Sequence, residues 1–288
     1  GTLDASNVCG NYGDVTSNNN DFKWDIVNTA SYYASIEADI TEKLTLSVDV
    51  RRQEDDVTSG GIGPYSGGAV GERTNVQQAV FKSTLPRLIL DYKPNENNTI
   101  YFSYSEGTLP GLFNPALASL TESQLAEVKQ QTGGAGVKID EEESQNIEIG
   151  IKSTILDGRG FISLAYYQTD LSNVHTPLFA VSYTADDGTT AVLSGNTTSQ
   201  GGDAELSGLE LDGTVRLNES WSVDFTYALN DSEIQSGFQS ADTFDLMGDR
   251  DAVIGNQFSR YPKNSGSVSA NYMRGLGAAS DLFARMDV

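Results

Sequence analysis

The sequence has little of several residue types that define common classes of protein. It holds one cysteine, Cys9, and one histidine, His175, in 288 residues. A lone cysteine excludes an internal disulfide framework and a cysteine-based zinc cluster. Basic residues are scarce, because 18 Lys and Arg stand against 40 Asp and Glu and give a formal net charge of -22. We expect no nucleic-acid partner, since phosphate backbones are recognised by clustered cations.

Long hydrophobic runs are also missing. No stretch reaches the roughly 18 to 20 apolar residues that a membrane-spanning helix needs, and no signal peptide opens the sequence. Hydrophobic residues nevertheless make up 38% of the chain. Composition alone therefore describes a soluble acidic protein, and the spacing of the apolar residues has to test that description.

Apolar residues recur at every second position rather than with a helical period. In WSVDFTYALN, from Trp221 to Asn230, alternate side chains are apolar and Ser222, Asp224 and Thr226 lie between them. Successive strand side chains point to opposite faces, so this segment is predicted to be a strand with one apolar face. The alternation predicts about ten such strands, whose lengths suit tilted bilayer-spanning strands of about 9 to 11 residues. They fall near 33–40, 44–51, 81–92, 100–104, 147–152, 162–167, 209–217, 221–230, 265–272 and 282–288.

The connections between these strands alternate strictly in length. Short ones at 41–43, 93–98, 156–159, 218–220 and 275–280 alternate with long ones near 53–75, 107–142, 171–203 and 232–263. All short turns then lie at one end of the strands and all long loops at the other. This arrangement predicts an all-β fold, an antiparallel up-and-down transmembrane β-barrel with one plain and one elaborated rim.

A soluble β-sandwich also alternates apolar with polar residues. A sandwich buries its apolar faces against each other and has no reason to sort its loops by length. Periodicity alone does not decide which face is inside, and the loop asymmetry favours the membrane barrel.

Four segments carry a resemblance to a known family. Two lie within FKSTLPRLILDYKPNENNTIYFSYSEGTLPGLFN (81–114), namely the strand around Pro86-Arg87-Leu88 and the stretch Tyr101–Asn114. The other two are the hairpin ESQNIEIGIKSTILDGRGFISLAYYQ (143–168) and the strand AELSGLEL (204–211). In this order they resemble the barrel of TonB-dependent outer-membrane receptors of the siderophore-receptor-like group. The resemblance extends over most of the chain from about Ala30 onward.

The resemblance implies that residues 1–288 are part of one receptor barrel domain. The family's plug domain, first strands and last strands have no counterpart, and such plugged barrels have about 22 strands. We therefore expect an internal fragment of a longer precursor. Cys9 is either a free thiol or paired with a cysteine outside this sequence.

The function implied by the resemblance is TonB-dependent uptake of a ferric siderophore or similar large ligand across the outer membrane of a Gram-negative bacterium. The implied partners are outer-membrane lipid and lipopolysaccharide, the transported ligand, and the TonB energy-coupling protein through the plug. No catalytic residue, cofactor or metal site is expected. The candidate ligand contacts are aromatic residues of the long loops, each of which has packing within its loop as the simpler alternative: Tyr65, Phe113, Phe179, Tyr183, Phe238, Phe244, Phe258 and Tyr261.

Two local motifs lie inside the long loops. Thr121-x-x-Gln124 resembles a capping box that opens a short helix through Val128. Residues 178–183 and 191–194 flank Asp186-Asp187-Gly188 and predict a small hairpin, either a binding flap or an extension of the barrel strands. His175 is expected to be a solvated loop residue.

Two other functions remain open on the sequence alone. One is a soluble, secreted β-rich domain that binds or acts on carbohydrate. The other, within the barrel class, is a passive porin.

Overall fold

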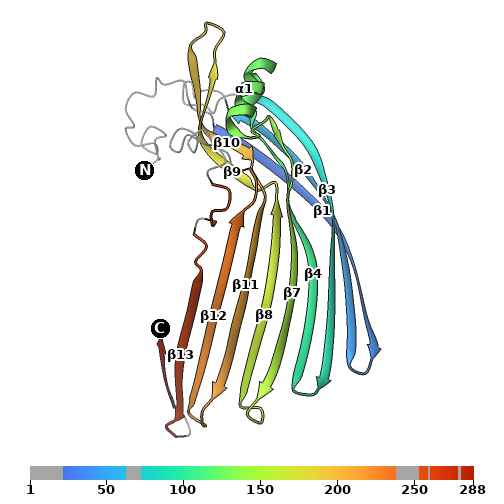
Figure 1. Cartoon of the computed structure of the whole chain (residues 1–288), viewed down its shortest axis with the longest axis vertical. Coiled ribbons are helices and arrows are strands. Elements are labelled where there is room, and N and C mark those ends of the chain that lie inside the picture. Colours follow the sequence, from blue (N-terminus) through green and yellow to red (C-terminus); the bar gives the residue numbers. More distant parts are fainter. Residues whose placement is uncertain (1–21, 63–72, 238–252, 259, 278–279) are drawn as a thin grey trace, which may run out of the picture.

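One large sheet dominates the structure, a computed structural model that describes residues 22–62, 73–237, 253–258, 260–277 and 280–288 (Figure 1). Ten strands follow one another in the order β1-β2-β3-β4-β7-β8-β11-β12-β13-β14, and all neighbours are antiparallel. We call this sheet the wall. Its strands are β1 (Phe22–Thr41), β2 (Leu44–Ile62), β3 (Arg73–Asn95), β4 (Asn98–Leu109), β7 (Glu142–Ile155), β8 (Gly160–Ser172), β11 (Ala204–Arg216), β12 (Trp221–Ile234), β13 (Asn264–Gly275) and β14 (Asp281–Asp287).

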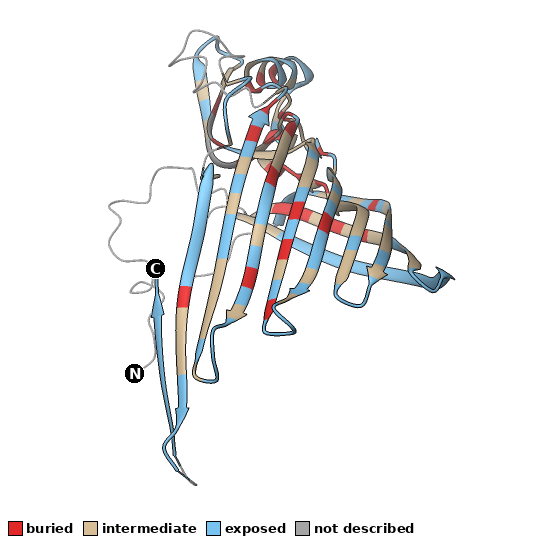
Figure 2. Cartoon of the chain, turned by 60° about the horizontal axis from the view of Figure 1, so that its bottom comes forward, coloured by how far each residue is buried: buried red, intermediate tan, exposed pale blue. Residues whose placement is uncertain are grey.

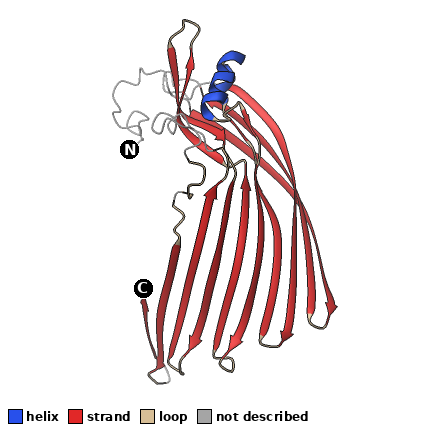
Figure 3. Cartoon of the chain, viewed as in Figure 1, coloured by secondary structure: helices blue, strands red, loops and turns tan. Residues whose placement is uncertain are grey.

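The remaining elements gather at the end of the wall that carries the long loops (Figure 3). β5 (Leu112–Phe113) pairs with β6 (Lys138–Ile139), and β9 (His175–Thr184) pairs with β10 (Thr190–Gln200). A 3-10 helix, η2 (Pro115–Ser119), precedes the α-helix α1 (Glu122–Thr132). Among the described residues, neither helix is long and apolar enough to cross a bilayer.

The predicted meander and its sorting of turns and loops are confirmed, with one correction. The segment 53–75 was expected to be a long loop, but β2 continues to Ile62 and β3 begins at Arg73. The prediction failed because this part of the ladder lacks an apolar alternation. Its polar side chains pair across strands instead, as when Gln78 Nε2 donates to Asp56 Oδ1 at 2.7 Å.

The strand register places most apolar positions of the alternating segments on one side of the wall. Directly paired residues of antiparallel strands share a face. One row of partners crosses eight strands and is apolar throughout: Ala38, Leu46, Leu90, Phe102, Ile149, Tyr166, Leu209 and Leu229. We call this side the apolar face. The side chain of Ile149 is 51% exposed there and that of Val48 42%.

The opposite side of the wall is polar. A neighbouring row of partners reads Asp39, Thr45, Asp91, Tyr101, Gly150, Ala165, Glu210, Ala228 and Ser265. We call this side the polar face. A shift of one residue in any pairing would exchange the two faces of that strand, so the register fixes the amphipathic character of the whole wall.

The short turns are built from residues suited to tight reversals. Leu156 and Asp157 have φ of 53° and 55° and Gly158 has φ of 84°. These left-handed conformations reverse the chain within the four-residue loop between Ile155 of β7 and Gly160 of β8. In another turn, the Asn218 carboxamide accepts hydrogen bonds from the amides of Ser220 (2.9 Å) and Trp221 (3.0 Å).

Buried apolar side chains lie mainly at the long-loop end. One cluster contains Leu117, Val128, Ala135, Leu178 and Val181, and a second contains Val57, Phe81 and Phe113. Figure 2 shows buried residues concentrated there and scattered singly along the wall. The wall therefore has no continuous apolar core of its own among the described residues, and its strands are joined by their backbone ladder.

Candidate functional site: the polar face and the cap

Two long loops fold together over the upper end of the wall. Residues 110–140 contain β5, η2, α1 and β6, and residues 174–202 contain β9 and β10. We call these two loops together the cap. Val57 and Phe81 contact Phe113 of the first loop. Both lie on the polar face, because Val57 is an even number of residues from Asp49 and Arg51 along β2, and Phe81 pairs with Asp55. The first loop thus bends over the polar face rather than away from it.

The predicted capping box begins the helix of the cap. The Thr121 amide donates to Gln124 Oε1 at 2.9 Å, and the Gln124 amide donates to Thr121 Oγ1 at 3.4 Å. Two donors that a helix start leaves without intrahelical partners are thereby satisfied. The helix is longer than expected and ends at Thr132, where Gly133 takes the left-handed conformation with φ of 70°.

The predicted hairpin is a separate two-stranded sheet, not a continuation of β8 and β11. The chain changes direction at Asn173, which has φ of 55°, and again at Gly201 and Gly202. A Cβ atom on Gly202 would lie 1.3 Å from the Ser236 carbonyl oxygen, so only glycine fits at this bend.

The tip of this hairpin carries Asp187, whose pKa is lowered by its neighbours. The hydroxyl and the amide of Thr189 both donate to Asp187 Oδ1, at 2.6 and 2.9 Å. These two hydrogen bonds, the hydroxyl's first, lower the pKa of the exposed Asp187 carboxyl below its ordinary value.

The polar face carries a tyrosine–glutamate–lysine group on β4 and β7. Tyr101 Oη donates to Glu148 Oε1 at 2.5 Å, and Lys152 Nζ lies 4.7 Å from the centre of the Tyr101 ring. The ring lies across Gly150, its direct partner, where a Cβ atom would come within 2.6 Å of ring atoms. Glycine therefore allows the tyrosine to lie flat along the wall.

A second tyrosine repeats this arrangement on β8 and β11. Tyr167 is paired with both Glu148 and Gly208, and a Cβ atom on Gly208 would lie 2.8 Å from the Tyr167 ring. Tyr167 Oη donates to Asn230 Oδ1 at 2.9 Å and also meets the hydroxyl of Tyr261. The segment before β13 is thus held against the polar face.

Carboxylates outnumber cations in this part of the polar face. Glu148, Glu210 and Asp212 lie on β7 and β11 near the tyrosines, and Lys152 lies among them. The group suits hydrogen-bond donors and cations more than free anions. Within the described ranges, no three His, Cys, Asp or Glu side chains are grouped so as to hold a metal ion.

The structure places the predicted ligand-contact aromatics in different surroundings. Tyr65, Phe238 and Phe244 lie outside the described residues, as does Cys9. Phe113 is 3% exposed and packs on Phe81, with ring centroids 6.4 Å apart. Tyr183 packs against the first apolar cluster, and Phe179 belongs to β9. Phe258 and Tyr261 lie between β12 and β13 and join the wall near Ser232 and Tyr167.

His175 joins the two loops of the cap. Its ring Nε2 lies 2.7 Å from the Asp140 carbonyl oxygen, and its backbone amide donates to Glu142 Oε2 at 3.0 Å. The expectation of a simply solvated loop residue is therefore incomplete, because the side chain has a defined partner in the other loop.

Tyr101 and Tyr167 were not among the predicted site residues. Their signal was present in the sequence, since each occupies a polar position of an alternating strand. A large aromatic residue at such a position, with glycine on the next strand, indicates a ring that lies on the polar face.

These features define an amphipathic antiparallel sheet whose long-loop end is roofed by a cap, the architecture of one part of a receptor barrel. Residues 2–286 match the family model described as "TonB dependent receptor-like, beta-barrel". The chain belongs to this family, which is one of receptors.

Known relatives agree with this assignment. The chain is 22% identical over 246 residues to the protein named "Probable TonB-dependent siderophore receptor PiuA" of Acinetobacter baumannii, covering 85% of this chain and 29% of that protein. Among solved structures, it resembles the ferric yersiniabactin uptake receptor FyuA of Yersinia pestis (TM-score 0.62, 17% identity, covering 92% of this chain and 34% of that one).

Two further solved structures share the fold. The siderophore receptor PiuA of Acinetobacter baumannii has a TM-score of 0.59 and 21% identity over 86% of this chain and 31% of that one. The copper transporter OprC has a TM-score of 0.56 and 13% identity over 87% of this chain and 33% of that one. The chain thus spans about a third of the length of these relatives, and identities this low establish the fold alone.

Proposed function

We propose that this chain forms part of the wall and outer entrance of an outer-membrane receptor that imports a ferric siderophore or similar large ligand. The observation that supports this proposal most strongly is the strand register. It gives the ten-stranded wall an apolar face and a polar face, with a row of apolar partners that crosses eight of the ten strands. Apolar positions on β12, from Trp221 to Leu229, extend along about 27 Å of strand, close to the apolar band of about 25 Å that such barrels present to lipid. The apolar face therefore contacts membrane lipid.

The polar face then lines the interior, and the long loops face the cell exterior. In this proposal residues 1–288 belong to one barrel domain whose plug, first strands and last strands are encoded elsewhere in the gene. Uptake depends on TonB acting through that plug, in the outer membrane of a Gram-negative bacterium. Lipopolysaccharide surrounds the long-loop end. Of the predicted ligand contacts, Tyr261 is the best supported, because its hydroxyl meets Tyr167 on the polar face.

A soluble carbohydrate-binding domain would need its apolar face covered by a second sheet. In the described part of the chain, both additional sheets have two strands and lie at the long-loop end. The exposed side chains of Val48 and Ile149 favour lipid as their neighbour over such a core.

Uptake of radioactive iron by cells that carry or lack the full-length gene tests this function. Cells should be given iron complexed to catecholate, hydroxamate or phenolate siderophores in turn. Gene-dependent uptake of at least one complex, abolished when TonB is deleted, is the expected result. Conductance or uptake that is independent of TonB would indicate a passive porin, and a product that stays soluble without detergent would contradict the membrane assignment.

A further inference from the structure

The two loops of the cap are joined by a side chain that substitutes for a β-strand. Asn114, in the first loop, is fully buried. Its Nδ2 donates to the Thr198 carbonyl at 2.8 Å, and its Oδ1 accepts from the Thr198 amide at 2.8 Å. Thr198 lies on β10, in the second loop. The carboxamide thus pairs with both backbone groups of one residue at a strand edge, as a neighbouring strand would.

The same carboxamide also closes the first loop on itself. Asn114 Nδ2 donates to the Gly136 carbonyl at 2.7 Å, and the Asn114 amide donates to the Val137 carbonyl at 2.8 Å. All hydrogen-bonding atoms of the side chain therefore have partners, and they connect the segments around Asn114, Gly136 and Thr198. Few other residue types offer two donors and an acceptor in one plane.

A second set of hydrogen bonds between the two loops joins α1 to β9. Three helix residues on one face, spaced three and four apart, make these contacts. Gln124 Nε2 donates to the Thr184 carbonyl (3.1 Å), Glu127 accepts from the Thr184 amide (2.9 Å), and Gln131 Oε1 accepts from Ser182 Oγ (3.0 Å). These hydrogen bonds are additional to those of Asn114.

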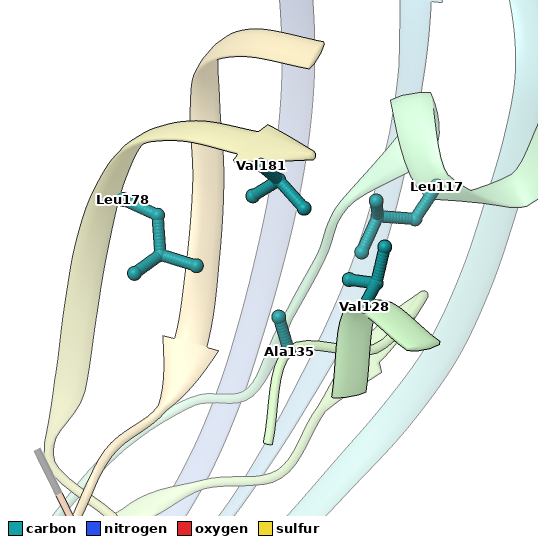
Figure 4. Packing of buried hydrophobic residues seen from close by; sticks show 5 residues of the cluster. All are labelled: Leu117, Val128, Ala135, Leu178 and Val181. Carbon is teal, nitrogen blue, oxygen red and sulfur yellow. The ribbon is translucent and has the colours of Figure 1, made fainter. Parts of the chain in front are cut away.

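The two loops also share an apolar core (Figure 4). Leu117, Val128 and Ala135 come from the first loop, and Leu178 and Val181 come from the second. Separation of the loops would expose this core as well as break both sets of hydrogen bonds.

The cap is also fixed to the wall. Phe113 directly precedes Asn114 and packs between Val57 of β2 and Phe81 of β3. Gly111 passes so close that a Cβ atom there would lie 2.2 Å from the Phe81 ring. The residue that joins the loops is thus adjacent to the residue that anchors them.

We propose that Asn114 is a positioning residue that holds the two cap loops together as one rigid unit. The contacts between the loops are then maintained while the receptor works. Any rearrangement at this part of the entrance then moves both loops together. The inference concerns the cap itself and does not rest on the identity of the ligand or the energy source.

Distances between spin labels in the full-length receptor test this proposal. Lys129→Cys on α1 and Thr190→Cys on β10 provide exposed label sites in the two loops, with Cys9→Ser in every variant. We expect one narrow distance distribution in native outer membranes, and a broad or double one after Asn114→Ala. Asn97→Ala, in a short turn at the other end of the wall, is the matched control and should leave the distribution unchanged. A broad distribution in the parent protein, or an unchanged one in Asn114→Ala, would overturn the proposal.

A rescue experiment separates joining from a general loss of structure. In the Asn114→Ala background, Gln131→Cys and Ser182→Cys bridged by a short bifunctional thiol reagent should restore the narrow distribution, now read between labels attached orthogonally at the same two sites. Failure of the bridge to restore it would count against a joining role.

Hydrogen exchange keeps the proposal testable if Asn114→Ala does not assemble. In the parent receptor, the Thr198 amide should be protected as strongly as the paired amides of β10, although its partner is a side chain. Rapid exchange at Thr198 in the parent protein would show that the contact with Asn114 is not maintained.

Discussion

The wall and the cap are stabilised by different means. The wall has ten strands joined by a regular backbone ladder, and large side chains on its apolar face are exposed in the isolated chain. The cap has a small apolar core and side-chain hydrogen bonds between residues far apart in sequence, such as Asn114 and Thr198. The wall therefore depends on its surroundings to satisfy its apolar face, whereas the cap is stabilised mainly by its own contacts.

This difference shows which changes each region tolerates. The effect of a substitution in the wall depends on the face to which the side chain points. Adjacent residues point to opposite faces, so the same substitution should have opposite effects on stability at adjacent positions. The effect of a substitution in the cap depends on the particular residues that the side chain contacts. It does not follow from the position of the residue in the sequence.

The largest effect is expected at the contact between cap and wall. Phe113→Ala removes a ring that is 3% exposed against Phe81 and Val57. Such truncations cost about 3 to 5 kcal/mol, and we expect the loss in the free energy of opening the cap rather than of unfolding the barrel. Limited proteolysis of the full-length receptor in membranes should show faster cleavage within residues 110–140. Leu109→Ala, at a 52% exposed side chain, should leave the cleavage rate unchanged.

A cation on the apolar face should be the next most damaging change. Val48→Arg places a charge on the face proposed to contact lipid, where the expected cost is about 2 to 4 kcal/mol. Ser47→Arg, one residue away on the polar face, should be nearly neutral. The measurement is the free energy of unfolding in phospholipid vesicles together with the yield of folded receptor. Equal losses for the two variants would contradict the assignment of the faces.

Gly111→Ala should have a smaller effect. The added Cβ atom would lie 2.2 Å from Phe81 Cε1 and 2.4 Å from the Ile139 carbonyl oxygen. Because one of these atoms is backbone, relief requires a shift of the loop, and overpacking of this kind costs about 1 to 3 kcal/mol. Gly136→Ala is the control, since its nearest atom would be the Lys138 carbonyl at 3.5 Å. The proteolysis assay used for Phe113→Ala should rank Gly111→Ala below it and above Gly136→Ala.

The smallest effect is expected at the tip of the hairpin. Thr189→Ala removes the hydroxyl that donates to Asp187, so the pKa of that carboxyl should rise toward its ordinary value. A depressed folded-state pKa stabilises the hairpin above the ordinary carboxyl pKa, and this contribution is lost as the pH falls through the depressed value. Carboxylate carbon NMR, with Asp187→Asn to assign the signal, measures the shift. An unchanged titration in Thr189→Ala would show that the hydroxyl does not set it.

The wall could be predicted from the sequence because its information is local. Alternation at Trp221–Asn230 fixes both the strand and its faces, and the turn at Asp157-Gly158 fixes a hairpin. The upper parts of β2 and β3 were missed because they lack an apolar face, and their polar cross-strand pairs have no sequence period.

The cap and the site were only partly predictable. The capping box at Thr121 and the hairpin around Asp187 are short-range patterns and were recognised. The contact between Asn114 and Thr198 joins residues 84 apart, and no periodicity links them. The burial of Phe113 likewise depends on β2 and β3, so its aromatic character alone did not distinguish ligand contact from packing.

The unequal strand lengths give the entrance an oblique rim. β3 has 23 residues and β13 has 12, and each has one end at a short turn of the meander. At about 3.3 Å per residue, the β1–β3 side carries roughly 35 Å more strand than the β13 side. The cap contacts this side of the wall, with its longer strands, through Phe113. In the proposed orientation these upper parts of β2 and β3 lie outside the membrane, and antibodies against residues 53–62 or 73–82 should bind intact cells.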